Sequence, residues 1–201
     1  MPIKIQYNKT SLHQLIKDLL VRENALPVLL AKESALRFEV KRAHHELIAL
    51  DAEIEREFAK EKEGVRLWCE FDENIMHVEE VAVGVKTIAG VKTPLLKNIR
   101  FTTHAYSVFE KPFWIPSGIE RLKRLATLVI TQEIALKKQQ ILETARKKTT
   151  QKVNLYQKVL IPEYQEAIRK IKRFLEDEEN LSKSSQKILK TRMAMAEAAA
   201  A

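Results

Sequence analysis

The stretch that decides the fold runs from Leu12 to Ile54 and reads LHQLIKDLLVRENALPVLLAKESALRFEVKRAHHELIALDAEI. Counted in sevens from Leu12, two core positions recur along it, and eleven of the thirteen sites are apolar. The exceptions are Arg22 and Glu33. A repeat of about 3.5 residues is typical of a coiled-coil helix. We therefore predict one long helix over residues 8–63.

Both ends of this first helix carry boundary signals. Asn8, Thr10 or Ser11 can cap its start, because their side-chain oxygens accept hydrogen bonds from unpaired backbone N–H groups. Gly64 follows its polar end, where helices often stop. Pro27 removes one backbone hydrogen bond within the helix, so a kink is expected there.

A second long helix is predicted over residues 118–192, with Ser117 as its N-cap. Its apolar stripe fades between about residues 137 and 152, where we expect the helix to face a partner or water. Pro162 is expected to bend it. The stripe consists of Ile119, Leu122, Leu125, Val129 and Leu136, and then of Val153, Leu160, Tyr164, Ala167, Ile171, Phe174, Leu181 and Ile188.

The segment 64–117 differs in composition, since it holds seven of the thirteen aromatic residues and several β-branched runs. It predicts a hairpin or short meander with turns near Gly84, Gly90 or Pro94, packed on the helix ends or on another protein. The expected fold is mainly α, a long antiparallel two-helix coiled coil with a small β-rich insert. Its expected parts are residues 1–63, 64–117 and 118–201.

Catalytic and ligand-binding chemistry is not expected in this chain. The four glycines do not cluster as a phosphate-binding loop or a dinucleotide-binding fingerprint requires. His44 and His45 are neighbours and point about 100° apart on a helix, so they do not share a metal. The acidic pairs, Glu79 with Glu80 and Glu178 with Glu179, have no nucleophile or acid partner beside them. We expect no catalytic residue, no metal and no cofactor.

The net charge of +8 arises in residues 118–201, because basic and acidic residues balance before them. A solvated helix face, a nucleic-acid surface and a surface for an acidic protein all fit this asymmetry. Residues 121–155 contain no aromatic side chain, which argues against nucleic acid. A single cysteine, no secretory signal and no apolar run of about 18 residues favour a cytoplasmic protein without a transmembrane helix.

Residues 149–162, TTQKVNLYQKVLIP, carry a family signature. They resemble the pattern T-T-R-R-V-N-A-L-E-x-x-x-I-P of the D subunits of V-type and archaeal-type (V/A) rotary ATPases, without a gap. The chain departs from it at Gln151 and over residues 155–157. Residues 168–179, IRKIKRFLEDEE, resemble the family's basic-apolar helix that runs into acidic residues. The order of helix, β-rich insert and helix also agrees across nearly the whole chain.

The resemblance implies a non-catalytic central-stalk rotor subunit that couples ATP hydrolysis or synthesis to proton or sodium transport. Its implied partners are the A and B subunits of the catalytic hexamer, a small companion stalk subunit of the F type and an adaptor on the membrane rotor ring. The helix ends that bear the termini are implied to enter the hexamer, and the membrane is reached only through the complex. A generic coiled-coil scaffold or tether and a basic helical nucleic-acid binder are the alternatives.

Two sets of residues are candidate contacts under this interpretation. A bearing surface that meets acidic loops of the hexamer is expected from Arg146, Lys147, Lys148, Lys152 and Asn154. The alternative for these residues is an ordinary solvated helix face. Contacts of the β-rich insert with a companion subunit, or a small local core, are expected from Trp68, Phe71, Phe113 and Trp114.

Overall fold

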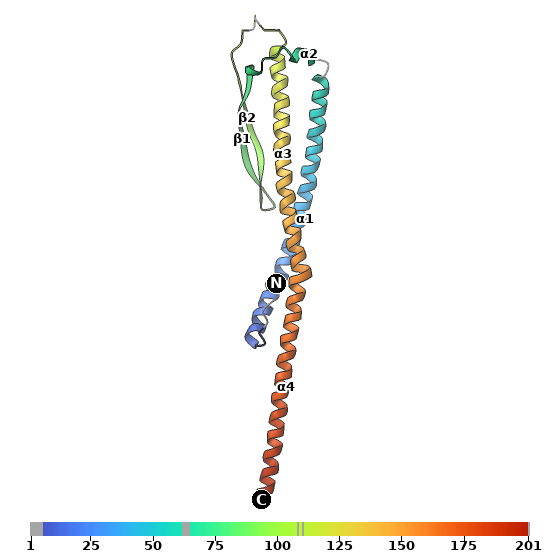
Figure 1. Ribbon diagram of the computed structural model, residues 1–201, viewed down its shortest axis with the longest axis vertical. Helices are drawn as coiled ribbons and strands as arrows, with labels where there is room; N and C mark the ends of the chain where they lie inside the picture. The colour runs from blue at the N-terminus through green and yellow to red at the C-terminus, as the bar shows by residue number, and fades with distance from the viewer. Residues whose placement is uncertain (1–5, 62–64, 108, 110, 201) are drawn as a thin grey trace. The chain divides into compact units, whose positions relative to one another are not determined.

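The computed structural model describes residues 6–61, 65–107, 109 and 111–200 (Figure 1). The expected boundary between residues 63 and 64, and the helix stop at Gly64, lie outside this description. The chain is mostly helical with one antiparallel hairpin between the long helices, which confirms the predicted fold class. Its elements in order are α1 (Lys9–Glu61), α2 (Val65–Trp68), the 3-10 turn η2 (Glu73–Ile75), β1 (Met76–Ile88), β2 (Val91–Thr103), α3 (Ile115–Leu155), the π-helical turn η3 (Tyr156–Leu160) and α4 (Ile161–Ala200).

The chain divides into two compact units, and each is described by itself. The terminal unit consists of Met1–Ala31 and Thr150–Ala201. The hairpin unit consists of Lys32–Thr149 and contains both strands.

The seven-residue pattern of α1 is confirmed at every predicted site. All thirteen core positions are buried or half-buried. Asn8 is the cap, since its Oδ1 accepts a hydrogen bond of 2.6 Å from the N–H of Ser11. The helix passes through Pro27 without a break, and the kink there stays a prediction.

The two polar residues at core positions of α1 each have a partner within their own unit. In the terminal unit, the Arg22 guanidinium lies 4.2 Å from the centre of the Tyr164 ring, a cation–π geometry. In the hairpin unit, Glu33 forms an ion pair of 2.7 Å with Arg37, one turn later. These contacts explain how a coiled-coil seam accommodates charge without leaving it unpaired.

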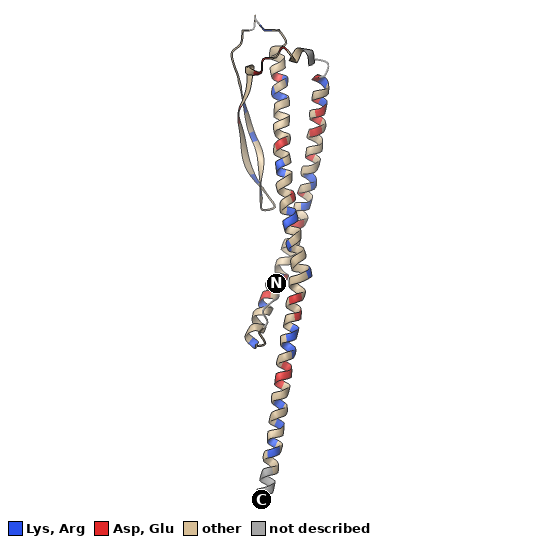
Figure 2. Ribbon diagram, in the orientation of Figure 1, with Lys and Arg blue, Asp and Glu red and all other residues tan. Residues whose placement is uncertain are grey.

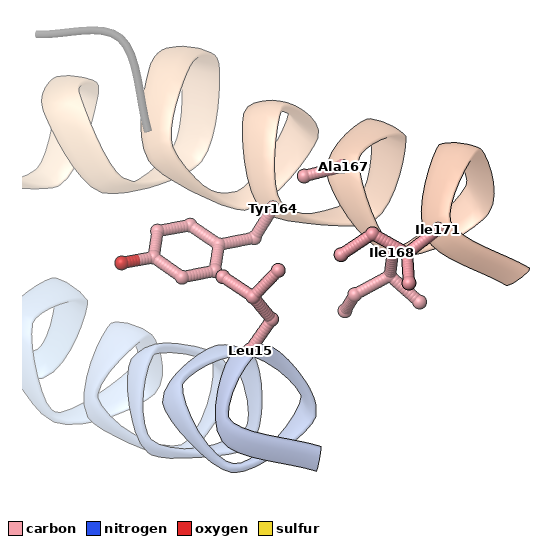
Figure 3. Close-up of a cluster of buried hydrophobic side chains, with 5 residues drawn as sticks. All are labelled: Leu15, Tyr164, Ala167, Ile168 and Ile171. Carbon is pink, nitrogen blue, oxygen red and sulfur yellow. The ribbon is translucent and has the colours of Figure 1, made fainter. Parts of the chain in front are cut away.

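The terminal unit is held by a small apolar cluster between α1 and α4 (Figure 3). Leu15 of α1 packs against side chains spaced three and four residues apart on α4, which lie on one helix face. Gln165 donates to Glu23 at 3.4 Å near one end of the pair, and the ring of Tyr7 contacts Phe174 near the other. The two helices therefore run antiparallel. The α4 members of the cluster are Tyr164, Ala167, Ile168 and Ile171.

In the hairpin unit, α1 runs antiparallel to α3. Glu46 pairs with Lys138 at 2.7 Å, and Glu61 pairs with Arg121 at 3.5 Å. A residue later in α1 therefore lies beside a residue earlier in α3. The fully buried Leu36 and Leu142 meet between the helices. Burying such side chains stabilises each by about 2 kcal/mol.

The insert is a single long hairpin, and only one of its three candidate turns is a turn. Ala89 and Gly90 have φ values of 49° and 75° and close the loop between the strands. These are left-handed conformations, which glycine adopts without steric cost. The turns expected at Gly84 and Pro94 are wrong, because both residues lie within the ladder, paired with Leu95 and Val85.

The hairpin does not pack only on the helix ends. Its tip, with Ile88 and Val91, packs against the cluster of Leu36, Ala43 and Leu142 in the helix pair. Residues 137–152 of the second helix were expected to face a partner or water, and this contact corrects that expectation for one face only. Leu142 is buried under the hairpin tip, whereas Lys148 and Lys152 are exposed. Leu142 stands among small and polar residues, so the sequence there shows little apolar periodicity. The hairpin nevertheless covers its side chain.

Two helix boundaries on the C-terminal side also differ from expectation. Helix α3 begins at Ile115, so Ser117 lies in its first turn, where its hydroxyl donates to the Trp114 carbonyl at 2.8 Å instead of capping. Just before Pro162 the backbone widens into η3, and the N–H of Ile161 donates to the carbonyl of Tyr156, five residues back. A π turn at this point relieves the clash between a proline ring and the carbonyl four residues earlier.

Candidate contact surfaces

The basic residues expected to form one surface are not equivalent. In the hairpin unit, Arg146 donates through Nε and a terminal nitrogen to Glu143, at 3.1 and 2.7 Å. This bond raises the pKa of Arg146, and it lowers the pKa of Glu143 below its usual 4.5. Lys147 lies 3.9 Å from the same carboxylate. Arg146 is therefore already engaged within its own helix.

Lys147, Lys148 and Lys152 are all exposed, but Lys148 and Lys152 form no ion pair with a residue that the structure describes. Lys148 belongs to the hairpin unit, whereas Lys152 and the exposed Asn154 belong to the terminal unit. Exposed lysines of this kind suit contact with acidic groups on a partner.

Three of the four predicted aromatic residues gather in one cluster beside the base of the hairpin. The ring centres of Trp68 and Trp114 are 5.3 Å apart, nearly edge to face, and the ring centre of Phe71 lies 5.6 Å from that of Trp68. Gly118 makes room for the cluster, since a Cβ there would come within 2.6 Å of the Trp114 ring. These three side chains therefore pack on one another and remain half-buried, and their contact with a companion subunit stays a prediction.

The fourth aromatic residue, Phe113, stands apart from that cluster. Its side chain is 99% exposed, and Phe109 in the same loop, which no sequence signal singled out, is 102% exposed. An apolar hollow of about 420 Å³ lies beside Phe113, between Tyr106 and Trp114. Two fully exposed phenylalanines in one loop, one of them beside a hollow, are unusual on a surface that faces only water.

The apolar stripe of α4 is only partly buried. Tyr164, Ala167 and Ile171 are buried as predicted, but Leu181 and Ile188 are 70% and 56% exposed. The reason is the length of the helices, because α1 begins at Lys9, which lines one hollow with Glu179 and Ser182, while α4 continues to Ala200. Figure 2 shows acidic and then basic residues along this part of α4.

The His, Cys, Asp and Glu side chains of the described residues are scattered. The described residues contain no group of three or more of these side chains that could hold a metal ion. The rings of His77 and His104 lie 5.5 Å apart at the base of the hairpin, as a pair only. No helix within the described ranges is long and apolar enough to cross a membrane.

Comparisons with known proteins agree over most of the chain. A family model that describes the D subunit of ATP synthase matches residues 11–191. The D subunit of the V-type ATP synthase of Chlamydia abortus is 32% identical over 160 residues, which cover 77% of each chain. The protein of the same name from Chlamydia felis is 33% identical with the same coverage. That of Chlamydia pneumoniae is 26% identical over 183 residues, 88% of this chain and 87% of the relative.

Proposed function

The chain belongs to the family of ATP synthase D subunits, and from this premise we propose that it is the central-stalk rotor subunit of a V-type ATP synthase. In this role it couples ATP hydrolysis or synthesis in a catalytic hexamer to proton or sodium transport through the membrane sector. The observation that carries the proposal is the match over residues 11–191, because it spans both long helices and the hairpin.

The mechanical properties of the described helices support a shaft. A rotor must transmit torque without large twist, so its helices need a continuous packed seam and few flexible residues. The thirteen core positions of α1 supply that seam, and beyond Gly118 in the first turn of α3 no glycine interrupts a long helix. Glycine within a helix is destabilising by about 1 kcal/mol relative to alanine, and it loosens the backbone.

The proposed rotor performs no chemistry itself. ATP is bound and turned over on the A and B subunits, which agrees with the scattered glycines of this chain. The other proposed partners are the small companion stalk subunit of the F type and the adaptor on the membrane rotor ring. The protein is then cytoplasmic and peripheral to the membrane, which it reaches only through the complex.

Two surfaces are proposed to meet the hexamer. The first is the bearing surface, in which Lys148 and Lys152 carry most of the charge effect because Arg146 is bonded to Glu143. The second is the exposed stripe of α4, with Leu181 and Ile188, which fits a helix end that enters an enclosing partner. Apolar side chains exposed at seven-residue spacing are typical of a surface covered in the assembled state.

Charge reversal tests the bearing surface. In the assembled complex, Lys148→Glu combined with Lys152→Glu is expected to reduce ATP-driven ion pumping severalfold, and addition of Arg146→Glu and Lys147→Glu to reduce it further. Lys41→Glu with Arg56→Glu is the matched control, because it makes the same charge change at exposed positions of α1.

Pumping is measured in vesicles that contain the complex, and the helicity of each isolated variant by circular dichroism. The double variant should keep its helicity, since neither lysine has a described ion pair. Pumping that equals the control would refute the bearing surface. Failure of the unaltered chain to purify with A- and B-type subunits would refute the rotor proposal as a whole.

A further inference from the structure

A groove runs between the hairpin and α3 inside the hairpin unit. Two hollows of about 420 and 380 Å³ form it, and they share Gln140 and Ile141 of α3 as lining residues. One hollow lies beside Val83 and Val85 of β1, and the other reaches along α3 to Lys148. We call this feature the hairpin–α3 groove.

The floor of the hairpin–α3 groove is apolar and open. Val85 is 72% exposed, and Val83 and Ile141 are also exposed although they face a concave surface. The tip of the hairpin packs against the helix pair, but the side chains of the strands leave the hollow beside α3 unfilled. Exposed apolar side chains that line a hollow are characteristic of a binding surface, whereas scattered single ones are ordinary.

The rim of the groove is basic. Lys92 and Lys137 border one hollow and Lys148 borders the other, and none of the residues that line either hollow is acidic. Lys137 forms an ion pair of 2.7 Å with Glu133, but both side chains are well exposed. Exposed pairs of this kind contribute little to stability, so a partner's carboxylate can compete for the lysine.

The length of the groove indicates the kind of segment that fits it. From Lys137 to Lys148 the helix rises by about 16 Å, which is three helical turns. A partner helix presents an apolar row at spacings of three and four residues over that distance, and it satisfies its own backbone hydrogen bonds. The mostly apolar lining matches such a row.

We propose that the hairpin–α3 groove binds an amphipathic helix of another subunit of the same complex. The apolar row of that helix lies on Val83, Val85 and Ile141, and carboxylates along its flanks face Lys92, Lys137 and Lys148. This inference rests on the proposed function and adds the chemistry of one partner: an acidic, amphipathic helix held by a subunit that contacts the side of the shaft.

Site-directed photo-crosslinking in the whole complex tests the proposal. Val85→Cys in a Cys69→Ser background is labelled with a benzophenone maleimide, and the complex is purified through a catalytic subunit before irradiation. Val78→Cys is the matched control, because it is an exposed valine on the same strand that lines neither hollow. The crosslinked peptide is identified by mass spectrometry.

The expected product joins Val85→Cys, but not Val78→Cys, to a helix of another subunit with an apolar row flanked by Asp or Glu. Lys92→Glu with Lys137→Glu should lower its yield at least about fivefold, while Lys41→Glu with Arg56→Glu leaves it unchanged. Lys148 stays intact in this experiment so that the bearing surface is not altered.

Several outcomes would overturn the inference. The first is the absence of a crosslinked product at Val85→Cys. The second is a product that contains a second copy of this chain, lipid, or a segment that lacks carboxylates. The third is a crosslinking yield that charge reversal of Lys92 and Lys137 does not change. In each of these the complex still purifies with its catalytic subunits. Loss of those subunits from the unaltered preparation instead refutes the proposed function, and the inference falls with it.

Discussion

The hairpin unit and the terminal unit use the same seven-residue pattern but complete it differently. In the hairpin unit the helix pair gains a third element, and Leu36 and Leu142 are fully buried beneath the hairpin tip. In the terminal unit the apolar cluster of the described residues comes from α1 and α4, and α4 continues beyond it with Leu181 and Ile188 exposed. An apolar repeat therefore marks a surface that other residues must cover. In the terminal unit the described residues cover only part of α4.

The largest expected effect tests the buried side of this comparison. Leu142→Ala should lower the free energy of unfolding by about 2–5 kcal/mol, because it leaves a cavity beneath the hairpin tip. Leu136→Ala, on the same helix but exposed, should cost less than about 1 kcal/mol. Urea unfolding followed by circular dichroism measures both. Equal losses would mean that the hairpin does not seal the helix pair.

The next effect concerns the aromatic cluster of the hairpin unit. Gly118→Ala should destabilise the chain by about 1–3 kcal/mol, since the new Cβ displaces the Trp114 ring and the surrounding side chains must shift. Near-ultraviolet circular dichroism of the two tryptophans should change at the same time. Pro116→Ala, at an exposed position of the same turn, is the control. An unchanged spectrum in Gly118→Ala would contradict the described packing.

A smaller effect separates the covered and uncovered parts of α4. Ile171→Val should cost about 1 kcal/mol in the isolated chain because Ile171 is fully buried. Ile188→Val should cost nearly nothing there, because its side chain is exposed. Thermal unfolding of the two variants makes the comparison. A cost at Ile188 equal to that at Ile171 would show that the isolated chain already covers the stripe.

The smallest effect is the pH dependence of the Glu143–Arg146 pair. The hydrogen bond from Arg146 lowers the pKa of Glu143 in the folded chain. The pair therefore stabilises the folded state at pH values above the ordinary carboxyl pKa of 4.5. This stabilisation is lost as the pH falls through the lowered pKa of Glu143. Glu143→Gln should therefore cost about 0.5 kcal/mol at pH 7 and nothing in strong acid.

The control for this titration is Glu53→Gln, since Glu53 is exposed and has no ion pair among the described residues. Thermal unfolding is followed from about pH 7 down to about pH 3 for both variants and the unaltered chain. A difference between Glu143→Gln and the unaltered chain that grows in acid would contradict the assigned pair.

Much of the helical framework could be predicted because it follows from local periodicity. The repeat from Leu12 located the buried face of α1, Asn8 was among the expected caps, and Gly90 was among the expected turns. Each of these signals depends on neighbours within a few residues. For the same reason, the stripe near Ile171 was assigned to the buried side.

The remaining features depend on contacts between residues distant in sequence. Leu142 lies in a stretch without periodicity, and only the returning hairpin explains its burial. The same pattern marks Ile171 and Ile188, although only one of them has a partner helix beside it. Among the candidate contacts, the bond that engages Arg146 and the exposure of Phe113 likewise follow from tertiary placement and from no motif.

Direct observation of rotation tests the central claim most sharply. The complex is fixed to a surface through its catalytic subunits, and a bead is attached to this chain at Lys86→Cys, an exposed hairpin position, in a Cys69→Ser background. The rotor proposal predicts unidirectional, stepwise rotation of the bead that requires ATP and stops when ATP is removed. A bead that stays in one orientation while the same complexes hydrolyse ATP would contradict it and would favour a fixed tether.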